Sequence, residues 1–258
     1  MCDLWKNTLE EDTQDGAVTA QITTALSELP PARRIKLYNA GSFFDPRAIP
    51  PAEDDRIAEL LAGFERVVVE SHPAFVRERC FEFAERLGTG RLEVAMGLET
   101  VQPEVLARLN KGMTLASFRE AAGRLCSRRI GLRAFVLAGL PWVEASEQLR
   151  WTTEAVEFAF ECGARAVSII PTRSGNGAMD ALAASRDFEP PRLELLENAL
   201  AAGLELRRGL VFADLWDLET FSACRGCFGR RSARLSAMNR MQAIAPPVAC
   251  GRCQEARA

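Results

Sequence analysis

Short runs of apolar and β-branched residues alternate along this chain with longer segments of helical periodicity. This alternation is typical of parallel sheets, because each strand needs a crossover that returns the chain to the same end of the sheet. The expected strands are 35–39, 66–70, 92–97, 131–138, 166–170 and 210–213. The expected helices are 15–29, 53–64, 73–87, 103–109, 115–129, 147–161 and 191–208. With right-handed crossovers, the pattern predicts an α/β fold, a partial (β/α)6 barrel of TIM type.

The composition narrows the setting in which such a barrel works. No stretch approaches 18 consecutive apolar residues, and the acidic beginning (Glu10, Glu11, Asp12, Asp15) has no signal-peptide pattern. No membrane contact is therefore expected, and the cytoplasm is the expected location. Eight cysteines in such a chain favour thiols as ligands over disulfides. The three that lie singly in helical patterns, Cys80, Cys126 and Cys162, are expected to be buried thiols.

Polar residues follow several of the expected strands. In (β/α) barrels the chemistry gathers at the carboxyl ends of the strands, so these positions are candidates for a site. They are Asn39, Ser42, Glu70, Glu99, Thr100, Thr172 and Arg173. Taken alone, they indicate only an enzyme that acts on a small molecule.

Five segments in order carry a more specific resemblance. They are MCDLWKN (1–7), KLYNAGSFFDPRAIP (36–50), VVVESHP (67–73), VAMGLETVQPEVLARLNKGMT (94–114) and RAFVLAGLPWVEASE (133–147). Together they resemble the radical S-adenosylmethionine superfamily, in its Elongator, methylthiotransferase and NifB-like group. The nearest branch is that of the archaeosine synthase radical subunit. The resemblance covers roughly residues 1–180.

The resemblance implies a [4Fe–4S] cluster held by three cysteines, with one iron left for S-adenosylmethionine. Cys2 matches the third of these cysteines, and Trp5 matches the aromatic residue that shields the cluster. Asn39, Gly41 and Ser42 stand where the family has Gly-Gly-Glu to hold the methionine ammonium group. Here the backbone role can survive while the carboxylate role is lost; a simple turn is the alternative for Asn39 and Ser42.

Four further positions match family residues around the cofactor. Glu70 matches a glutamate that contacts the nucleoside, and Glu99 one near the methionine and ribose. Lys111 matches the cation near the methionine carboxylate, and Gly139 would let adenine approach the backbone. Structural ion pairs are the alternative for the two glutamates, and a surface lysine for Lys111. His72, the single histidine, is expected to stabilise its loop rather than to move protons.

The family pattern requires two more cysteines before Cys2, and this sequence has Met1 directly before it. We expect a start placed at an internal methionine or a truncated chain, so that the barrel lacks its first strand; a degenerate homologue is the competing explanation. As written, the chain is expected to be inactive, because two cluster cysteines are missing.

The last part of the sequence changes in character. Two CxxC pairs, Cys224/Cys227 and Cys250/Cys253, enclose 22 residues (228–249), a spacing typical of four thiolates around one Zn²⁺. An auxiliary iron–sulfur cluster is the alternative. Residues 224–258 hold seven arginines and one acid, which suggests an anionic partner or a solvated surface. We expect a barrel domain at 1–220 and a small zinc-ribbon-like module at 221–258.

The resemblance implies an enzyme that generates a 5′-deoxyadenosyl radical, with ferredoxin or flavodoxin as electron donor. Its branch and the basic tail suggest a modified nucleoside or tRNA as substrate. Two alternatives remain: a degenerate barrel that acts as a zinc-bearing RNA-binding subunit, and a cluster-free TIM-barrel aldolase or isomerase.

Overall fold

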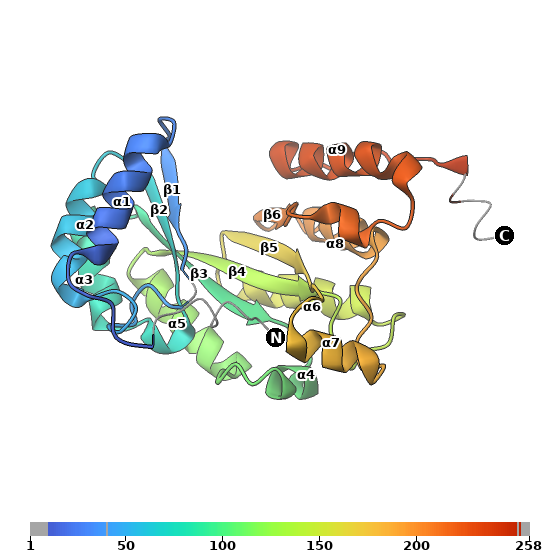
Figure 1. Ribbon diagram of the computed structural model, residues 1–258, viewed down its shortest axis with the longest axis horizontal. Helices are drawn as coiled ribbons and strands as arrows, with labels where there is room; N and C mark the ends of the chain where they lie inside the picture. Colours follow the sequence, from blue (N-terminus) through green and yellow to red (C-terminus); the bar gives the residue numbers. More distant parts are fainter. Residues whose placement is uncertain (1–9, 40, 252, 254–258) are drawn as a thin grey trace.

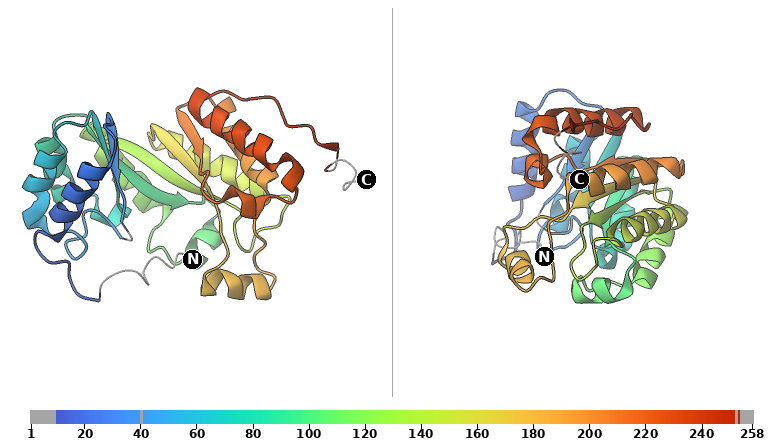
Figure 2. Two further views of the ribbon diagram at one scale, coloured as in Figure 1. Left: turned by 45° about the horizontal axis from the view of Figure 1, so that its top comes forward. Right: turned by 90° about the vertical axis from the view of Figure 1, so that its right-hand side faces the viewer.

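The computed structural model describes residues 10–39, 41–251 and 253. Its centre is one sheet of six parallel strands in the order β1-β2-β3-β4-β5-β6 (Figure 1). The strands are β1 (Arg34–Leu37), β2 (Arg66–Glu70), β3 (Leu92–Glu99), β4 (Gly131–Ala138), β5 (Ala166–Pro171) and β6 (Leu210–Ala213). The sheet curls into an arch, so that the fold is an open half-barrel (Figure 2). The predicted α/β partial barrel is confirmed.

Helices connect the strands and cover the outer face of the arch (Figure 1). The α-helices are α1 (Ala17–Glu28), α2 (Asp54–Leu60), α3 (Glu78–Leu87), α4 (Pro103–Arg108), α5 (Leu115–Ser127), α6 (Gln148–Glu161), α7 (Gly177–Ala184), α8 (Leu193–Glu205) and α9 (Arg225–Met241). Short 3-10 turns are η2 (Pro51–Glu53), η3 (Pro73–Phe75) and η4 (Leu218–Phe221). None of the helices in the described ranges is both long and apolar enough to cross a membrane.

Local sequence explains where several helices begin. Thr114 and Ser117 form a capping box at the start of α5, each side chain bonding the backbone N–H of the other. The side chain of Gln102 caps α4, in which Pro103 takes the first position. The predicted helix 73–87 is divided into η3 and α3, which begins only at Glu78. Both caps lie in the connection that follows the carboxyl end of β3.

The two faces of the sheet differ in burial. On β4, the side chains of Leu132, Ala134 and Val136 point outward and are fully buried beneath the helices. The alternating residues, Arg133 and Phe135, point into the arch and remain partly exposed. The hydrophobic core therefore lies between the sheet and its helices, while the inner face of the arch stays open.

The two edges of the sheet also differ. At β6, the side-chain amide of Asn239 donates to the carbonyl of Ala213 and accepts from its N–H, at 2.8 and 2.9 Å. The amide of Gln242 forms the same pair with Val211, at 2.9 and 2.8 Å. Beside β1, a cavity of about 710 Å³ is lined by residues of the strand, of α1 and of the segment 10–14.

The tail differs from its prediction in secondary structure. The CxxC spacing predicts a ribbon-like module, but a 17-residue helix, α9, begins at the first CxxC pair and ends nine residues before Cys250. This helix packs against β6 and η4. The interpretation as a ribbon is wrong because the segment has a buried helical stripe that joins it to the barrel.

Candidate functional site

A charged cluster lies at the carboxyl ends of β2 and β3. The carboxylate of Glu99, a residue only 9% exposed, is 2.8 Å from the ammonium group of Lys111. Glu99 has a left-handed backbone (φ 65°) at an irregularity of the β3–β4 pairing, and its side chain folds back over Gly97. A Cβ atom at Gly97 would lie 2.3 Å from a Glu99 carboxylate oxygen, so glycine at this position lets the carboxylate of Glu99 lie against the strand. The family motif around Glu99 thus has a packing reason.

Glu70 ends β2 within the electrostatic range of this ion pair. The pKa of Glu70 is raised from its ordinary 4.5 to about 7, mainly by burial; the charge of Lys111 lowers it and the charge of Glu99 raises it by smaller amounts. At neutral pH this carboxyl group is therefore only partly ionised. A carboxyl group with such a pKa in a polar rim is a candidate for ligand contact.

The loop after β1 is tied to this cluster by hydrogen bonds. The buried hydroxyl of Ser42 accepts from the N–H of His72 at 2.9 Å, and the N–H of Phe43 donates to the carbonyl of Glu70 at 2.8 Å. The Nδ1 atom of His72 accepts from Ala74, so its Nε2 atom carries the proton and donates to the carbonyl of Lys111 at 2.8 Å. The expected loop-stabilising role of His72 is confirmed.

The remaining predicted cofactor residues differ in their exposure and in what surrounds them. Asn39 is exposed at the end of β1, and a Cβ atom at Gly41 would meet only Ala48, at an ordinary 3.8 Å. Gly139 has φ 86°, and carbons of Pro191 lie 2.7–2.8 Å from where its Cβ would be. Chain packing alone thus requires Gly139 to be glycine, and its role toward adenine stays a prediction. Cys2 and Trp5 lie outside the described residues.

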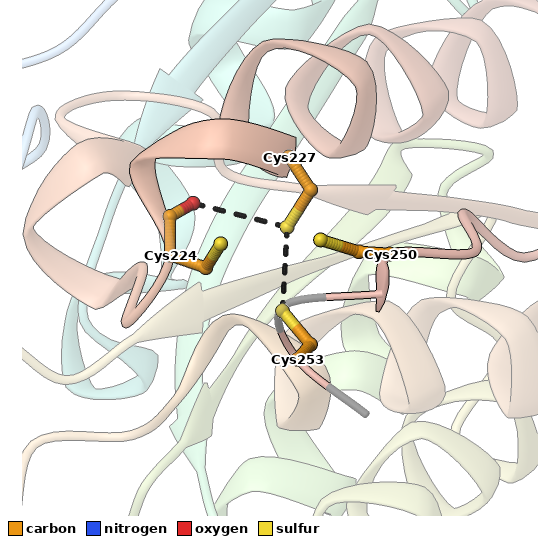
Figure 3. A group of neighbouring side chains, drawn as sticks. All are labelled: Cys224, Cys227, Cys250 and Cys253. Atoms are coloured by element: carbon orange, nitrogen blue, oxygen red, sulfur yellow. Dashed lines mark hydrogen bonds between the residues drawn. The ribbon is translucent and has the colours of Figure 1, made fainter. Parts of the chain in front are cut away.

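A second candidate site is formed by the four cysteines of the tail (Figure 3). The Sγ atoms of Cys224, Cys227, Cys250 and Cys253 all lie within 4.8 Å of one another, and those of Cys227 and Cys253 are 3.7 Å apart. Four thiolates around one Zn²⁺ at about 2.3 Å place neighbouring sulfurs roughly 3.8 Å apart. The predicted convergence of the two CxxC pairs is confirmed, and these residues can bind a metal.

The backbone around these cysteines favours thiolate at two of them. Cys224 is the N-cap residue of α9, and the N–H of Cys227 lowers the pKa of the Cys224 thiol to about 7. The N–H of Cys253 likewise lowers the pKa of Cys250. Burial raises the pKa of Cys227, and the neighbouring sulfurs raise that of Cys253 to about 12. A bound metal ion would replace the protons on these two thiols.

Helix α9 is held to the barrel by buried ion pairs. The guanidinium of Arg231 bonds Glu197 at 3.0 Å and Glu194 at 2.9 Å. Arg234 lies 3.3 Å from Glu197 and donates to the carbonyls of Ala245 and Pro246 at 2.9–3.0 Å. Two of the arginines that make the tail basic are thus structural. Among the described residues of the tail, Arg225, Arg230 and Arg240 are exposed.

Comparisons with known proteins agree with the resemblance seen in the sequence. No family model matches. The archaeosine synthase subunit beta of Thermococcus kodakarensis is 38% identical over 93 residues, which are 34% of this chain and 29% of that protein. An uncharacterized protein of Methanocaldococcus jannaschii is 24% identical over 164 residues, or 62% of this chain and 45% of that protein. The structure of Elp3 from Methanocaldococcus infernus superposes with a TM-score of 0.63 at 15% identity, over 87% of this chain and 58% of the Elp3 chain.

This chain is similar in sequence to the archaeosine synthase subunit beta and in fold to Elp3. The sequence match to the archaeosine synthase subunit agrees with the branch that the motifs resemble. At 15% identity, the likeness to Elp3 concerns the fold alone. The chain spans less than half the length of the curated relatives it matches, so the activity of a radical S-adenosylmethionine enzyme is for this chain a proposal.

Proposed function

We propose that this chain forms the barrel of a cytoplasmic radical S-adenosylmethionine enzyme that modifies a nucleoside in tRNA. The observation that carries the proposal is the cluster of Glu70, Glu99 and Lys111 at the carboxyl ends of neighbouring strands in a half-barrel. The archaeosine synthase subunit and Elp3 as relatives support a substrate related to tRNA.

The residues of the cluster fit the polar groups of S-adenosylmethionine. Carboxylates accept from an ammonium group or from ribose hydroxyls, and a lysine pairs with a carboxylate. Glu70 and Glu99 would accept, and Lys111 would offer the positive charge while its pairing with Glu99 holds both side chains in place. The contacts of Ser42 and His72 keep the three loops together around the ligand. A [4Fe–4S] cluster, when bound, would supply the electron for the reductive cleavage of S-adenosylmethionine, and hydrogen abstraction from the substrate would follow that cleavage.

Anoxic reconstitution of the full gene product with iron and sulfide tests the proposal. The measurements are iron and sulfide content, S-adenosylmethionine binding, and 5′-deoxyadenosine release with ferredoxin or flavodoxin as reductant. Glu99→Gln should weaken S-adenosylmethionine binding by about tenfold or more, because it removes a charged acceptor and the partner of Lys111. Glu59→Gln, at an exposed ion pair on α2, is the matched control. A colourless protein that binds no S-adenosylmethionine would instead favour a cluster-free aldolase or isomerase.

We also infer that the tail holds one zinc ion. A multi-iron cluster would spread its cysteine ligands further than one ion does, so sulfurs within 4.8 Å of one another favour a single ion. Metal analysis of the 258-residue chain purified without added iron should give one zinc per chain and no visible absorbance. Brown protein with two or more irons per chain would favour the auxiliary iron–sulfur cluster.

The rival function, a zinc-bearing RNA-binding subunit without radical chemistry, draws on the basic tail. It loses support because Arg231 and Arg234 are committed to Glu197 and to backbone carbonyls. Salt-sensitive tRNA binding by a full gene product that releases no 5′-deoxyadenosine would favour this rival.

A further inference from the structure

The inner face of the half-barrel extends beyond the residues proposed to bind the cofactor. Along β4, β5 and β6, the residues that point into the arch are partly exposed, whereas their neighbours beneath the helices are buried. The strand register places Phe135, Ser168 and Phe212 side by side on this face. The inner face is therefore a solvent-accessible surface that includes aromatic side chains.

Two aromatic rings meet across this surface. Tyr38 follows β1 and Phe135 lies on β4, yet their ring centroids are 5.9 Å apart in an edge-to-face arrangement of 84°. Between their strands, β3 contributes the small residues Ala95 and Gly97 to this face, and the side chain of Glu99 folds over Gly97. Tyr38 remains 44% exposed, so an aromatic ring is available to a planar ligand. Burial raises the pKa of its hydroxyl to about 12, which keeps that group a neutral donor.

The same face carries an excess of positive charge. Arg66 and Arg133 share the single carboxylate of Glu93, at 3.6 and 2.8 Å, and Arg173 pairs with Asp214 at 2.8 Å. The fourth cation is Lys36, on β1, whose ammonium group is 5.9 Å from the centre of the Tyr38 ring.

Within the described part of the chain, these four cations thus stand against the two carboxylates of Glu93 and Asp214. Burial and, less strongly, the charge of Arg133 lower the pKa of Lys36, while Glu93 and Asp214 act in the opposite direction. Glu70, at the rim, is only partly ionised at neutral pH and offsets little of this charge.

We propose that the inner face binds one nucleotide of an RNA strand, with the base against Tyr38 and the phosphate beside Lys36. An aromatic ring and an ammonium group 5.9 Å apart suit a ligand that joins a planar ring to an anion. The sheet order leaves β1 and β6 unpaired with each other, so the face opens sideways and admits a nucleotide still joined to its neighbours. What is done to that nucleotide rests on the proposed function; its binding does not.

Calorimetric titration of the chain with guanosine 5′-monophosphate and with guanosine, without iron or S-adenosylmethionine, tests the assignment. The monophosphate should bind, and guanosine should bind about tenfold more weakly because it lacks the charge that Lys36 recognises. Lys36→Gln should bring monophosphate binding down to the level of guanosine. Tyr38→Ala should weaken both ligands about tenfold, and Tyr38→Phe should restore them. Arg33→Gln makes the same charge change just before β1, at an exposed ion pair, and should leave binding unchanged.

Three outcomes would overturn the assignment. They are no saturable binding of the monophosphate by the unaltered chain, equal binding by Lys36→Gln and Arg33→Gln, or failure of a single-stranded RNA to compete with the monophosphate. Thermal unfolding of each variant shows whether it is folded before titration. If nucleotide binding follows the expected pattern but no 5′-deoxyadenosine is formed, the proposed function fails while the binding site stands.

Discussion

The two edge strands of the half-barrel differ in what covers them. At β6, Asn239 and Gln242 make the donor and acceptor bonds that a neighbouring strand would make. At β1, a cavity lies between the strand and α1. A sheet edge exposes backbone groups that favour pairing with another chain, so covering one edge with side chains is a protective arrangement. The β6 edge is therefore covered by side chains of α9 and of the residue that follows it, whereas a cavity lies beside the β1 edge.

The closed edge depends on one helix and on what holds it. Helix α9 begins at the four-cysteine site, is paired to α8 through Arg231 in its middle, and caps β6 near its end. Metal binding and closure of the β6 edge should therefore be linked, while the β1 edge should not respond. The predictions below test this contrast.

Removal of the metal should have the largest effect on the closed edge. Thiolate coordination of zinc contributes on the order of 10 kcal/mol in small zinc domains, and here it joins the start of α9 to the segment that returns along it. Cys227→Ser, at a residue 1% exposed, should abolish stoichiometric zinc and speed amide hydrogen exchange at Val211 and Ala213. Exchange in β1 and β2 should stay unchanged. Cys126→Ser, at an exposed cysteine, is the control. Equal exchange at both edges would contradict the link.

Loss of the ion pair between Arg231 and Glu197 should have the next largest effect on stability. Arg231 is buried, and its removal leaves the carboxylate of Glu197 with a single partner, Arg234. Breaking a buried pair typically costs about 3–5 kcal/mol, so Arg231→Ala should lower the free energy of unfolding by about that amount. The adjacent exposed Arg230→Ala should change it by less than about 0.5 kcal/mol. Urea denaturation of the two variants measures the difference; similar midpoints would show that α9 is not anchored here.

The side-chain amides of Asn239 and Gln242, which bond β6, should contribute less to stability than the Arg231 ion pair. Asn239→Ala leaves the N–H and the carbonyl of Ala213 without their partner, which costs about 1–3 kcal/mol for buried groups. Gln242→Ala should do the same at Val211, and the double variant should increase amide exchange along β6. Arg240→Ala, on the exposed side of the same turn, serves as control. Unchanged exchange at Val211 and Ala213 would mean that the caps do not protect the edge.

The sequence predicted the strands well because buried parallel strands are continuous apolar runs; three of the six have the expected bounds, at 66–70, 131–138 and 210–213. It missed α9 although Cys227, Arg231, Leu235 and Met238 recur at helical spacing and are buried. A charged residue in the stripe hid the pattern, because its burial depends on acids from α8.

The candidate site likewise has features that the sequence predicted and features that it did not. The convergence of the four cysteines followed from local spacing, and the loop-tying role of His72 from its place before a proline. The expected burial of Cys126 is wrong, because it lies exposed at the end of α5. The Tyr38–Phe135 contact joins residues nearly a hundred positions apart on non-adjacent strands, and no local pattern signals it.

A last, smaller effect should appear at Glu70, which ends β2. Its substitution should increase the free energy of unfolding, whereas the substitutions above should decrease it. The pKa of Glu70 is about 7 in the folded chain against an ordinary 4.5, so the folded state binds more protons than the unfolded state between these values. Its contribution to stability is complete below pH 4.5 and is lost as the pH rises through 7. Glu70→Gln should therefore raise the free energy of unfolding at pH 8 by about 1–2 kcal/mol and leave it nearly unchanged at pH 4.5.

Urea denaturation at pH 4.5 and pH 8 tests this prediction, with the exposed Glu59→Gln as control. A gain at pH 8 that is absent at pH 4.5 would show that Glu70 is kept for ligand contact at the expense of stability, unlike Arg231, which the fold itself requires. A loss at both pH values would instead place Glu70 among the structural ion pairs.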